Sequence, residues 1–377
     1  MELIDIAKQL ISKEKSIQLI YAFNGTGKTR LSREFIKLFP AECLSNDDIT
    51  KKTENNFRKL LYYNDLTEDL FFWKNESLDQ ERHTLHIQEN YFTSWLISFL
   101  KDQGQDKNII SNFQRYTNSN INANFSQNFD FVNFSIESGG NNSIREIKIS
   151  KGEESNFIWS LIYTFLDEVA NVLIESAEDR SCHDFDEIEY IFIDDPVSSL
   201  DENHLIEIAV DLIRLIKKFP RKVKFIISTH NPFFYNVVHN TFKKSEQGIL
   251  NKYILKKPKE EDFEILELKE SHFSYHLHLL EEIKKAINNN EVKRYHFNFL
   301  RNVLERMAIF LGHKNWRDIL PDEFKDKIAS YEERLININS HSDFFADESF
   351  YSSNKARQDI EDIYKAINEK YNFSLNY

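Results

Sequence analysis

The order of apolar and polar positions predicts alternating strands and helices in the first two thirds of the chain. A short apolar run precedes the first glycine cluster, and the helix expected after it carries Leu31, Phe35 and Leu38 on one face. Strands that alternate with helices indicate an α/β fold, in which a parallel sheet is covered by helices. Later the pattern predicts a strand at 189–193, a helix at 202–218 and a strand at 223–229.

The remaining stretches divide into a mixed middle region and a helical end. Residues 40–150 alternate short apolar runs with turns rich in Asn and Ser, which predicts mostly strands and connectors, with one helix at about 91–102. A longer helix is expected over 156–174, where apolar residues keep helical spacing. The last third is mostly helical. We therefore expect two domains, residues 1–265 and residues 266–377.

Composition narrows the class of protein. The chain has 377 residues, 41% of them hydrophobic, so it can bury a large core. No apolar run approaches the roughly 20 residues that a membrane span needs, and no secretory signal is expected. Two cysteines are too few for a disulfide framework, which favours a reduced, cytoplasmic protein with no membrane partner. The net charge of −13 argues against a protein that coats nucleic acid through its phosphates.

The sequence AFNGTGKT, residues 22–29, nearly matches the phosphate-binding loop GxxxxGK[ST]. Glycines let the backbone wrap around an anion, and the amides that open the following helix point at phosphate. The lysine would reach the terminal phosphates and the threonine would hold Mg²⁺. Ala22 stands where the pattern has its first glycine, and its small side chain is compatible with the loop. The predicted nucleotide-binding residues of this loop are Asn24, Gly25, Thr26, Gly27, Lys28 and Thr29.

Two adjacent carboxylates end the apolar run at 190–193, in the stretch IDDPVSSLD. Such a pair repels itself and costs desolvation unless a cation lies nearby. Mg²⁺ and Lys28 would supply that charge if Asp194 joins Thr29 in binding the metal and Asp195 polarises the attacking water. The alternative is a solvated strand end, which the glycine loop earlier in the chain disfavours.

Two further stretches complete a resemblance to the ABC-type ATPases: SKGEE at 150–154, before a long helix, and STHNP at 228–232, at the end of a strand. They resemble the signature loop and the switch histidine of that family, and IDDPVSSLD resembles its Walker B segment and D-loop. The resemblance implies an ATPase head, ATP or GTP with Mg²⁺, and two composite sites in a head-to-tail dimer. It adds to the predicted nucleotide contacts Ser150, Lys151, Gly152, Glu153, Asp201 and His230.

The chain departs from the ABC pattern in three places. Asp195 stands where that family usually has a catalytic glutamate, which implies slow turnover, and Lys151 replaces the first glycine of the signature pair. The glutamine loop has no clear counterpart, although Asn64 follows a predicted strand and occupies a plausible position. The stretch between Thr29 and Ser150 holds no sustained heptads, which disfavours a DNA-tethering ATPase with a long coiled coil.

In the last third, residues 292–312 predict an amphipathic helix that stops at Gly312. Arg301 and Glu305 are four residues apart, so they share one face of this helix beside the apolar stripe. Taken alone, such a pair is usually a surface ion pair of little consequence. The apolar stripe consists of Leu300, Val303, Leu304, Met307 and Leu311.

Over nearly its full length the sequence resembles the bacterial anticodon nucleases, from QLIYAFNGTGKTRLS through LYYNDLTEDLFFW, KGEESNFIWS, FIDDPVSSLDENHLIE and SYHLHL to RYHFNFLRN and NSHS. In that family an N-terminal ABC-type NTPase controls a smaller, mainly helical ribonuclease domain. The resemblance implies a catalytic set of Arg301, Glu305 and His341, in which RNVLE carries the first two residues and NSHS the third.

The segment KRYHF, just before the catalytic helix, adds candidate RNA contacts. Unstacked bases of a loop can be held on aromatic or guanidinium faces, which this segment offers. The alternative is that Tyr295 or Phe297 belongs to the core. The candidate RNA-binding residues are Lys293, Arg294, Tyr295 and His296.

These residue types suit RNA cleavage by the neighbouring 2′-hydroxyl. A carboxylate and an imidazole can share the acid and base roles near neutral pH, and arginine can stabilise the charge of the phosphorane. Which of Glu305 and His341 is the base stays open. The resemblance implies an endoribonuclease that cuts a lysine transfer RNA 5′ to the wobble base and leaves a 2′,3′-cyclic phosphate and a 5′-hydroxyl.

The same resemblance implies how the activity is controlled. A type I restriction-modification complex would silence the protein, and a phage-encoded activator would release it as a defence toxin through NTP hydrolysis. GTP is the implied activating nucleotide and dTTP a stabilising ligand. Two alternatives stay open: a regulatory ABC-type ATPase that acts on DNA or on a partner effector, and a non-enzymatic docking subunit of a restriction complex. The set of Arg301, Glu305 and His341 favours the nuclease.

Overall fold

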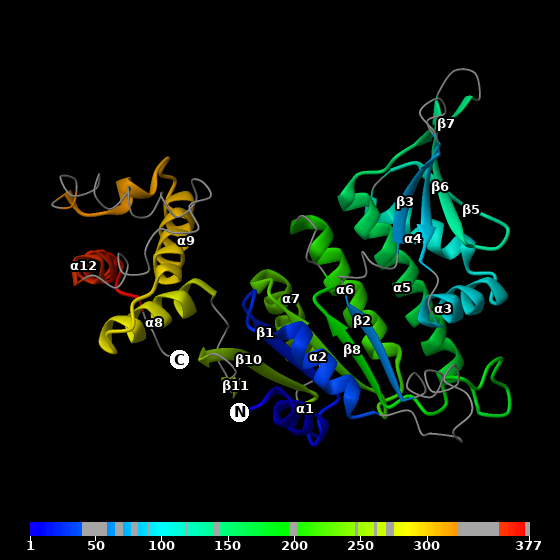
Figure 1. Ribbon diagram of the computed structural model, residues 1–377, viewed down its shortest axis with the longest axis horizontal. Coiled ribbons are helices and arrows are strands. Elements are labelled where there is room, and N and C mark those ends of the chain that lie inside the picture. Colours follow the sequence, from blue (N-terminus) through cyan, green and yellow to red (C-terminus); the bar gives the residue numbers. More distant parts are fainter. Residues whose placement is uncertain are drawn as a thin grey trace. The chain divides into compact units, whose positions relative to one another are not determined.

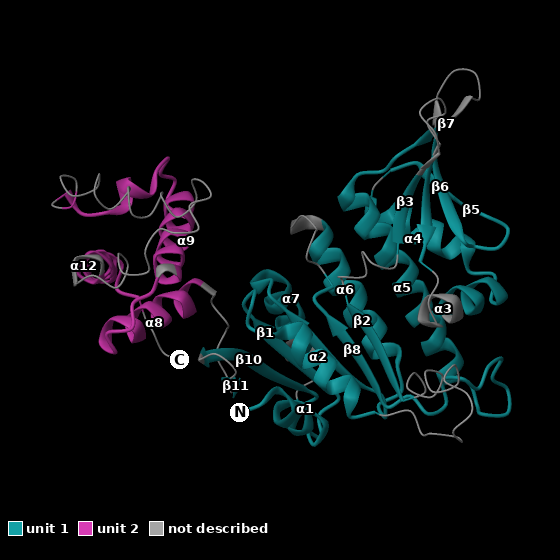
Figure 2. Cartoon of the chain, in the orientation of Figure 1, with its two compact units in different colours: residues 1–270 teal, residues 271–377 magenta. Residues whose placement is uncertain are grey.

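The computed structural model divides the chain into two compact units, Met1–Glu270 and Ser271–Tyr377 (Figure 2). Two of the predicted site residues, Asp201 and His341, lie outside the described residues. The structure describes residues 1–39, 59–64, 71–76, 82–88, 91–117, 119–138, 143–196, 202–245, 248–259, 262–268, 275–322, 324 and 354–373.

The first unit is built on a six-stranded sheet with the strand order β11-β10-β1-β9-β8-β2 (Figure 1). Every pairing is parallel except that of the edge strand β11 with β10. This arrangement confirms the predicted α/β class, with a mixed and mainly parallel sheet. The strands are β1 Ile17–Ala22, β2 Leu60–Asn64, β8 Tyr190–Asp194, β9 Lys224–Thr229, β10 Leu250–Lys259 and β11 Asp262–Glu267.

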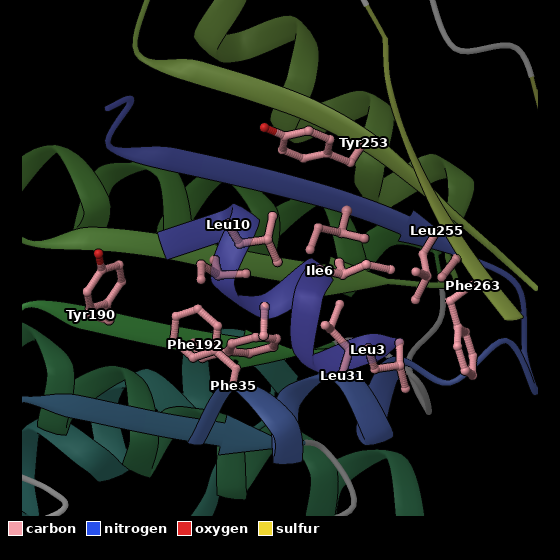
Figure 3. Packing of buried hydrophobic residues seen from close by; sticks show 14 of the residues in the cluster. Leu3, Ile6, Leu10, Leu31, Phe35, Tyr190, Phe192, Tyr253, Leu255 and Phe263 are labelled. Carbon is pink, nitrogen blue, oxygen red and sulfur yellow. The ribbon is translucent and has the colours of Figure 1, made fainter. Parts of the chain in front are cut away.

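One face of this sheet packs against helices α1 (Leu3–Ile11) and α2 (Lys28–Lys37). All six residues of β1 are buried, which is why this strand appears in the sequence as a continuous apolar run. As predicted, α2 turns Leu31 and Phe35 inward, and both are fully buried in the core that Figure 3 shows. The ring of Phe35 meets that of Phe192 on β8 at a centroid distance of 5.4 Å.

Helices α6 (Glu202–Lys218) and α7 (Pro232–Ser245) follow β8 and β9 in the chain. Helix α6 confirms the predicted helix at 202–218. On the face of the sheet opposite α2, the ring of Tyr235 on α7 meets that of Tyr21 edge to face, with centroids 5.8 Å apart. The carboxyl ends of β1, β8 and β9 therefore open onto one edge of a sheet that is covered on both sides, which is where ligands bind in such folds.

A second, antiparallel sheet belongs to the same unit. Its order is β3-β4-β6-β5, with β7 paired to β6. The long helix α5 (Lys151–Ile174) packs against it, and the ring of Phe157 meets that of Phe134 at 5.1 Å. Helix α5 is long and apolar enough to cross a membrane by composition, but most of it is buried inside the fold. The strands are β3 Phe71–Glu76, β4 Arg82–Ile87, β5 Ile121–Phe125, β6 Phe131–Ser138 and β7 Ser143–Ile147.

The middle region contains one helix more than the sequence predicted. Helix α3 (Tyr91–Asp102) is the expected one, and α4 (Asp106–Thr117) follows it. The many Asn and Ser residues around α4 favoured turns, yet Ile109, Phe113 and Tyr116 recur at helical spacing, and all three are fully buried. Burial of that stripe outweighs the local preference of the polar residues for turns.

The two units divide after Glu270, whereas the sequence suggested a boundary after residue 265. The physical reason lies in β11, a strand that the sequence pattern did not predict. Its residues Leu266 and Glu267 pair with Ile254 and Tyr253 of β10, so they belong to the sheet of the first unit.

The second unit is helical in its described part. Four helical elements pack together there: α8 (Tyr275–Asn288), α9 (Arg294–Phe310), a short 3₁₀ helix (Trp316–Ile319) and α12 (Asn354–Tyr371). Helix α9 ends at Phe310, and Gly312, the predicted stop, follows the C-cap with a φ of 77° in the left-handed region. The amide of Gly312 donates to the carbonyl of Ile309 and that of His313 to Ala308, which is the Schellman pattern of helix ends.

Candidate nucleotide and nuclease sites

The phosphate loop lies between β1 and α2, as its sequence predicted. Gly25 and Gly27 have φ values of 77° and 102°, a region that side chains rarely adopt. At Gly27 a Cβ would also lie 3.0 Å from the ring of Phe263, so this position is closed to larger residues. Helix α2 begins at Lys28, so its first amides face the loop. Phe263 comes from β11, and nothing in the loop sequence indicates this contact.

Lys28 is 9% exposed and its ammonium group lies among oxygen atoms. Its Nζ is 3.4 Å from the carbonyl of Ala22, 3.4 Å from Oδ1 of Asn24 and 3.5 Å from Oδ2 of Asp195. The loop lysine and the second of the two adjacent carboxylates thus meet, although 167 positions separate them in the chain. This is the charge compensation that the sequence required.

Asp194 ends β8 and is only 1% exposed. Its carboxylate accepts hydrogen bonds from the hydroxyl groups of Ser228, of Ser32 at 3.4 Å and of Thr29. Burial, and then the charge of Asp195, raises the pKa of Asp194 above its usual value despite these donors and Lys28. The carboxylate is therefore incompletely compensated. A hard cation held by Asp194 and the Thr29 hydroxyl fits this donor set, and Mg²⁺ prefers such oxygen ligands.

Asp195 has a φ of 56°, an uncommon conformation that turns its side chain toward the end of β9. Its Oδ1 accepts from the Thr229 hydroxyl at 3.2 Å and from the His230 amide at 3.2 Å, and its Oδ2 is hydrogen-bonded to Nδ1 of His230. Burial alone would raise the pKa of Asp195, but the hydrogen bond from His230 and the charges of His230 and Lys28 hold it below its usual value. The pKa values of the two adjacent carboxylates are thus shifted in opposite directions. Such a difference in environment lets similar groups take different roles in one site.

Residues beyond the sequence predictions complete this edge of the sheet. The Tyr62 hydroxyl lies 3.0 Å from Oγ of Ser32, and burial raises the pKa of Tyr62 to about 12. Asn64, the candidate for the glutamine loop, pairs in register with Asp194 at the ends of β2 and β8. Ser228 lies in the quoted STHNP stretch, but its hydrogen bond to Asp194 depends on strand order, which the sequence does not reveal.

The signature segment begins helix α5. Ser150 and Glu153 form a capping box: the Ser150 hydroxyl accepts from the Glu153 amide at 3.3 Å, and the Glu153 carboxylate accepts from the Ser150 amide at 2.7 Å. Lys151 is 71% exposed and lies 3.2 Å from Glu154, which is buried and also accepts from Nε1 of Trp73 at 2.9 Å. These contacts fix the start of α5 and leave the Lys151 side chain largely in solvent.

Two of the three proposed nuclease residues, Arg301 and Glu305, lie on α9. Nε of Arg301 donates to Oε1 of Glu305 at 2.7 Å, and the two side chains are 27% and 45% exposed. The predicted apolar stripe faces inward with Leu300, Val303 and Leu304 buried. Met307 is half-buried and Leu311, at 42% exposed, lies outside the buried part of the stripe. His341 falls outside the described residues.

The segment KRYHF, which forms the N-cap and the first turn of α9, divides into buried and exposed positions. His296 is 4% exposed, and its Nδ1 accepts the backbone amide of Lys293 at 2.9 Å, so the ring secures the start of the helix. Burial lowers the pKa of His296 to about 4. Phe297 is also buried, whereas Tyr295 is 47% exposed and Lys293 is exposed. Of the four candidate RNA contacts, Lys293 and Tyr295 are therefore accessible, His296 is not, and the Arg294 side chain lies outside the described part.

Two comparisons with known proteins each match more than half of the chain. The family described as an AAA domain matches residues 133–368. A curated Escherichia coli protein named "Anticodon nuclease" is 46% identical over 332 residues, which cover 86% of this chain and 82% of that protein.

Solved structures give weaker likenesses. An SMC head domain from Thermotoga maritima has a TM-score of 0.31 at 11% identity, and the match covers 67% of this chain and 90% of that one. CbiO1 of Clostridium perfringens, part of an ABC transporter complex, has a TM-score of 0.31 at 13% identity over 72% of this chain and 82% of that one. At these scores the likenesses add nothing to the fold assignment, which rests on the strand order itself.

Proposed function

The chain belongs to the anticodon nuclease family and combines an NTPase domain with an endoribonuclease, and from this premise we propose that it cuts a transfer RNA in the anticodon loop under control of its nucleotide site. The observation that carries the proposal is the Arg301–Glu305 pair on α9. The pair follows the basic segment along α9 and presents a partly exposed carboxylate and guanidinium, where an RNA phosphate can meet both.

The chemistry follows from these groups. Arg301 binds the scissile phosphate and stabilises the charge that develops on it, because guanidinium is always charged and can bind two phosphate oxygens at once. Glu305 and His341 share proton removal from the 2′-hydroxyl and proton donation to the leaving 5′-oxygen. The products are a 2′,3′-cyclic phosphate and a 5′-hydroxyl. Lys293 and Tyr295, which are exposed at the start of the helix, are candidates for contacts with the unstacked bases.

The nucleotide site would act as the switch. Mg²⁺ would be held by Thr29 and Asp194, and the attacking water would be oriented by Asp195 with His230. The phosphates would be held by the loop residues Asn24, Gly25, Thr26, Gly27 and Lys28. The exposed Lys151 and the rest of the signature segment (Ser150, Gly152 and Glu153, with Asp201) would close on the nucleotide of a second copy, in a head-to-tail dimer. Analytical ultracentrifugation of the Asp195→Asn variant tests this: saturating ATP or GTP should produce a dimer, and a persistent monomer would contradict it.

Substrate and partners take their finer detail from the family resemblance. The proposed substrate is a lysine transfer RNA cut 5′ to the wobble base, GTP is the proposed activating nucleotide and dTTP a stabilising ligand. In the cell the protein would be a toxin of antiviral defence, silenced by a type I restriction-modification complex and released by a phage-encoded activator.

A direct experiment compares two transfer RNA substrates with the purified protein. The first is unmodified, and the second carries a 2′-O-methyl group on the ribose before the scissile bond. Cleavage of the first should leave a cyclic phosphate, and the second should resist, because the methyl group removes the nucleophile. Equal cleavage of both would contradict the proposed chemistry. Cleavage at a site outside the anticodon loop would contradict the substrate assignment but leave the chemistry intact.

A further inference from the structure

The polar face of α9 extends beyond the Arg301–Glu305 pair. Successive residues of a helix are turned by about 100°, so Asn302 and Arg306 follow Glu305 around the axis and the four side chains occupy one arc of the surface. Asn302 and Arg306 are both exposed. The opposite side of the helix is the buried one, with residues such as Leu300. The proposed catalytic pair is therefore one half of a larger polar surface.

An imidazole from the neighbouring helix borders the other half. His276 lies in the first turn of α8, is half-buried and is hydrogen-bonded to the side chain of Asn302. Burial, and then the charge of Arg306 on α9, lowers the pKa of His276 below its usual value. The ring is thus mainly neutral at neutral pH. It fixes the orientation of the Asn302 amide without adding a charge of its own.

Arg306 is placed to meet an anion. The positions three and four residues from it hold Asn302, Val303, Ile309 and Phe310, none of which is acidic. Arg301, by contrast, has Glu305 four residues away and is paired with it. An exposed guanidinium with no acidic residue three or four positions away on its own helix, beside an oriented amide, offers the fork of donors that phosphate prefers.

We propose that His276, Asn302 and Arg306 form a second phosphate subsite of the nuclease, which holds a backbone phosphate of the RNA next to the one that is cut. This inference rests on the proposed function. Arg306 lies five positions after Arg301, a rise of about 7.5 Å along the helix axis, so the two side chains can reach two phosphates rather than compete for one. Arg306 supplies the charge, and His276 is a positioning residue that acts through Asn302.

The first test measures steady-state cleavage of a synthetic lysine anticodon stem-loop RNA by the full chain. Arg306→Gln should raise KM about tenfold, the cost of losing a charged hydrogen bond, while kcat stays within about twofold. It should also reduce the slope of log KM against log salt by about 0.7, the value for one phosphate contact in a single strand. Arg306→Lys should restore the salt slope but only part of KM, since lysine lacks the guanidinium fork.

The matched control is Lys314→Gln. It removes the same charge from an exposed position in the turn after α9, and it should change neither KM nor the salt slope. A second comparison tests the positioning role. His276→Leu and Asn302→Ala should each raise KM, and the double variant should be no worse than the single ones, because both act through one contact. His276→Gln, which can still hydrogen-bond the Asn302 amide, should recover most of the affinity.

The outcomes separate this inference from the proposed function. Unchanged KM and salt slope in Arg306→Gln would overturn the subsite while the nuclease assignment stands. Equal losses in Arg306→Gln and Lys314→Gln would also overturn it, because they would assign the effect to net charge. Glu305→Ala tests the other claim: if that variant cuts the RNA as the wild type does, the proposed active site is wrong whatever Arg306 does.

Discussion

The two sites of this protein hold their charges in different ways. At the nucleotide site Lys28 and Asp195 are 9% and 14% exposed, and each has several partners that come from different strands and loops. At the proposed nuclease surface Arg301 and Glu305 are 27% and 45% exposed, and their mutual contact lies along one helix. The first site is built by the fold, whereas the second is a surface that RNA would have to cover before its charges act in a dry environment.

This difference determines where mutations should be felt. An exposed ion pair contributes between about 0 and 1 kcal/mol to stability, so loss of the Arg301–Glu305 pair should leave folding intact and affect the reaction only. A buried charge that loses its partner is much more costly, because the remaining charge stays desolvated. Changes at Lys28, Asp194 or Asp195 should therefore affect both stability and function.

The largest effect is expected from Glu305→Ala. Removal of a general acid or base typically costs a factor of about 10² to 10⁴ in rate, so transfer RNA cleavage should fall by that amount. The melting temperature should stay within about 1 °C of wild type, since the side chain is exposed. Cleavage is measured on gels after induction in a host and with purified protein. A variant that melts much earlier than wild type would show that the pair is structural and would remove the contrast.

The second-largest effect is expected from Lys28→Ala, on NTP hydrolysis. The loss of one preorganised phosphate contact costs about 10² to 10³ in rate, so NTP hydrolysis should nearly vanish. Cleavage of transfer RNA at high protein concentration should persist but no longer respond to GTP or ATP, because Lys28 takes no part in the RNA chemistry. The measurements are phosphate release and RNA cleavage on the same preparation. If Lys28→Ala instead abolished cleavage at every concentration, the two activities could not be separated as proposed.

Features that depend on local sequence patterns were predictable from the sequence. The strand at 189–193, the helix at 202–218 and the strand at 223–229 depend on local periodicity, and each appears within one residue of its prediction. The pairing of Lys28 with the carboxylates was predictable because adjacent buried acids require a cation. The Gly312 helix end followed from the conformational freedom of glycine.

The missing pieces depend on contacts between distant parts of the chain. Phe263 beside Gly27 and Ser228 beside Asp194 are set by strand order, which no local pattern encodes. Helix α4 was missed because its polar composition favours turns, and burial of its apolar stripe overrides that preference. His296 was read as an RNA contact from its type alone, but the ring is buried and secures the start of α9. Residue type indicates which contacts a side chain can make, and burial decides whether that side chain is accessible to a ligand.

The buried His296 predicts acid sensitivity in the second unit. Its pKa is about 4 in the fold, against about 6.5 in an unfolded chain, so the unfolded state binds more protons between these values. Stability should therefore be complete above about pH 6.5 and fall as the pH drops toward 4, by at most about 3 kcal/mol. His296→Gln removes the titrating group and should flatten this part of the curve. Thermal melts of both proteins between pH 4 and 7 measure the difference, and parallel curves would contradict the prediction.

The smallest effect is expected from Asp194→Asn, which tests whether the charge of Asp194 at the nucleotide site is incompletely compensated. Because the pKa of Asp194 is raised in the fold, its contribution to stability is present at low pH and is lost as the pH rises through the folded pKa. Asp194→Asn mimics the protonated form, so without nucleotide at pH 7 it should stabilise the protein by about 1 kcal/mol, or about 2–4 °C in melting temperature. Added Mg²⁺ and nucleotide should then stabilise the wild type but not the variant.

Asp211 provides the matched control for that experiment. It is also buried, but it lies 2.6 Å from Arg115 and accepts a hydrogen bond from Tyr116 at 2.7 Å, so its charge is already paired. Asp211→Asn should therefore destabilise the protein at pH 7, the opposite sign from Asp194→Asn, and should leave the response to Mg²⁺ and nucleotide unchanged. Two buried aspartates in one unit would then differ in sign for one reason: the fold provides a cation for one of them and leaves the other to bind a metal. If both variants shifted the melting temperature in the same direction, burial rather than missing charge compensation would govern Asp194, and the metal assignment would lose its physical basis.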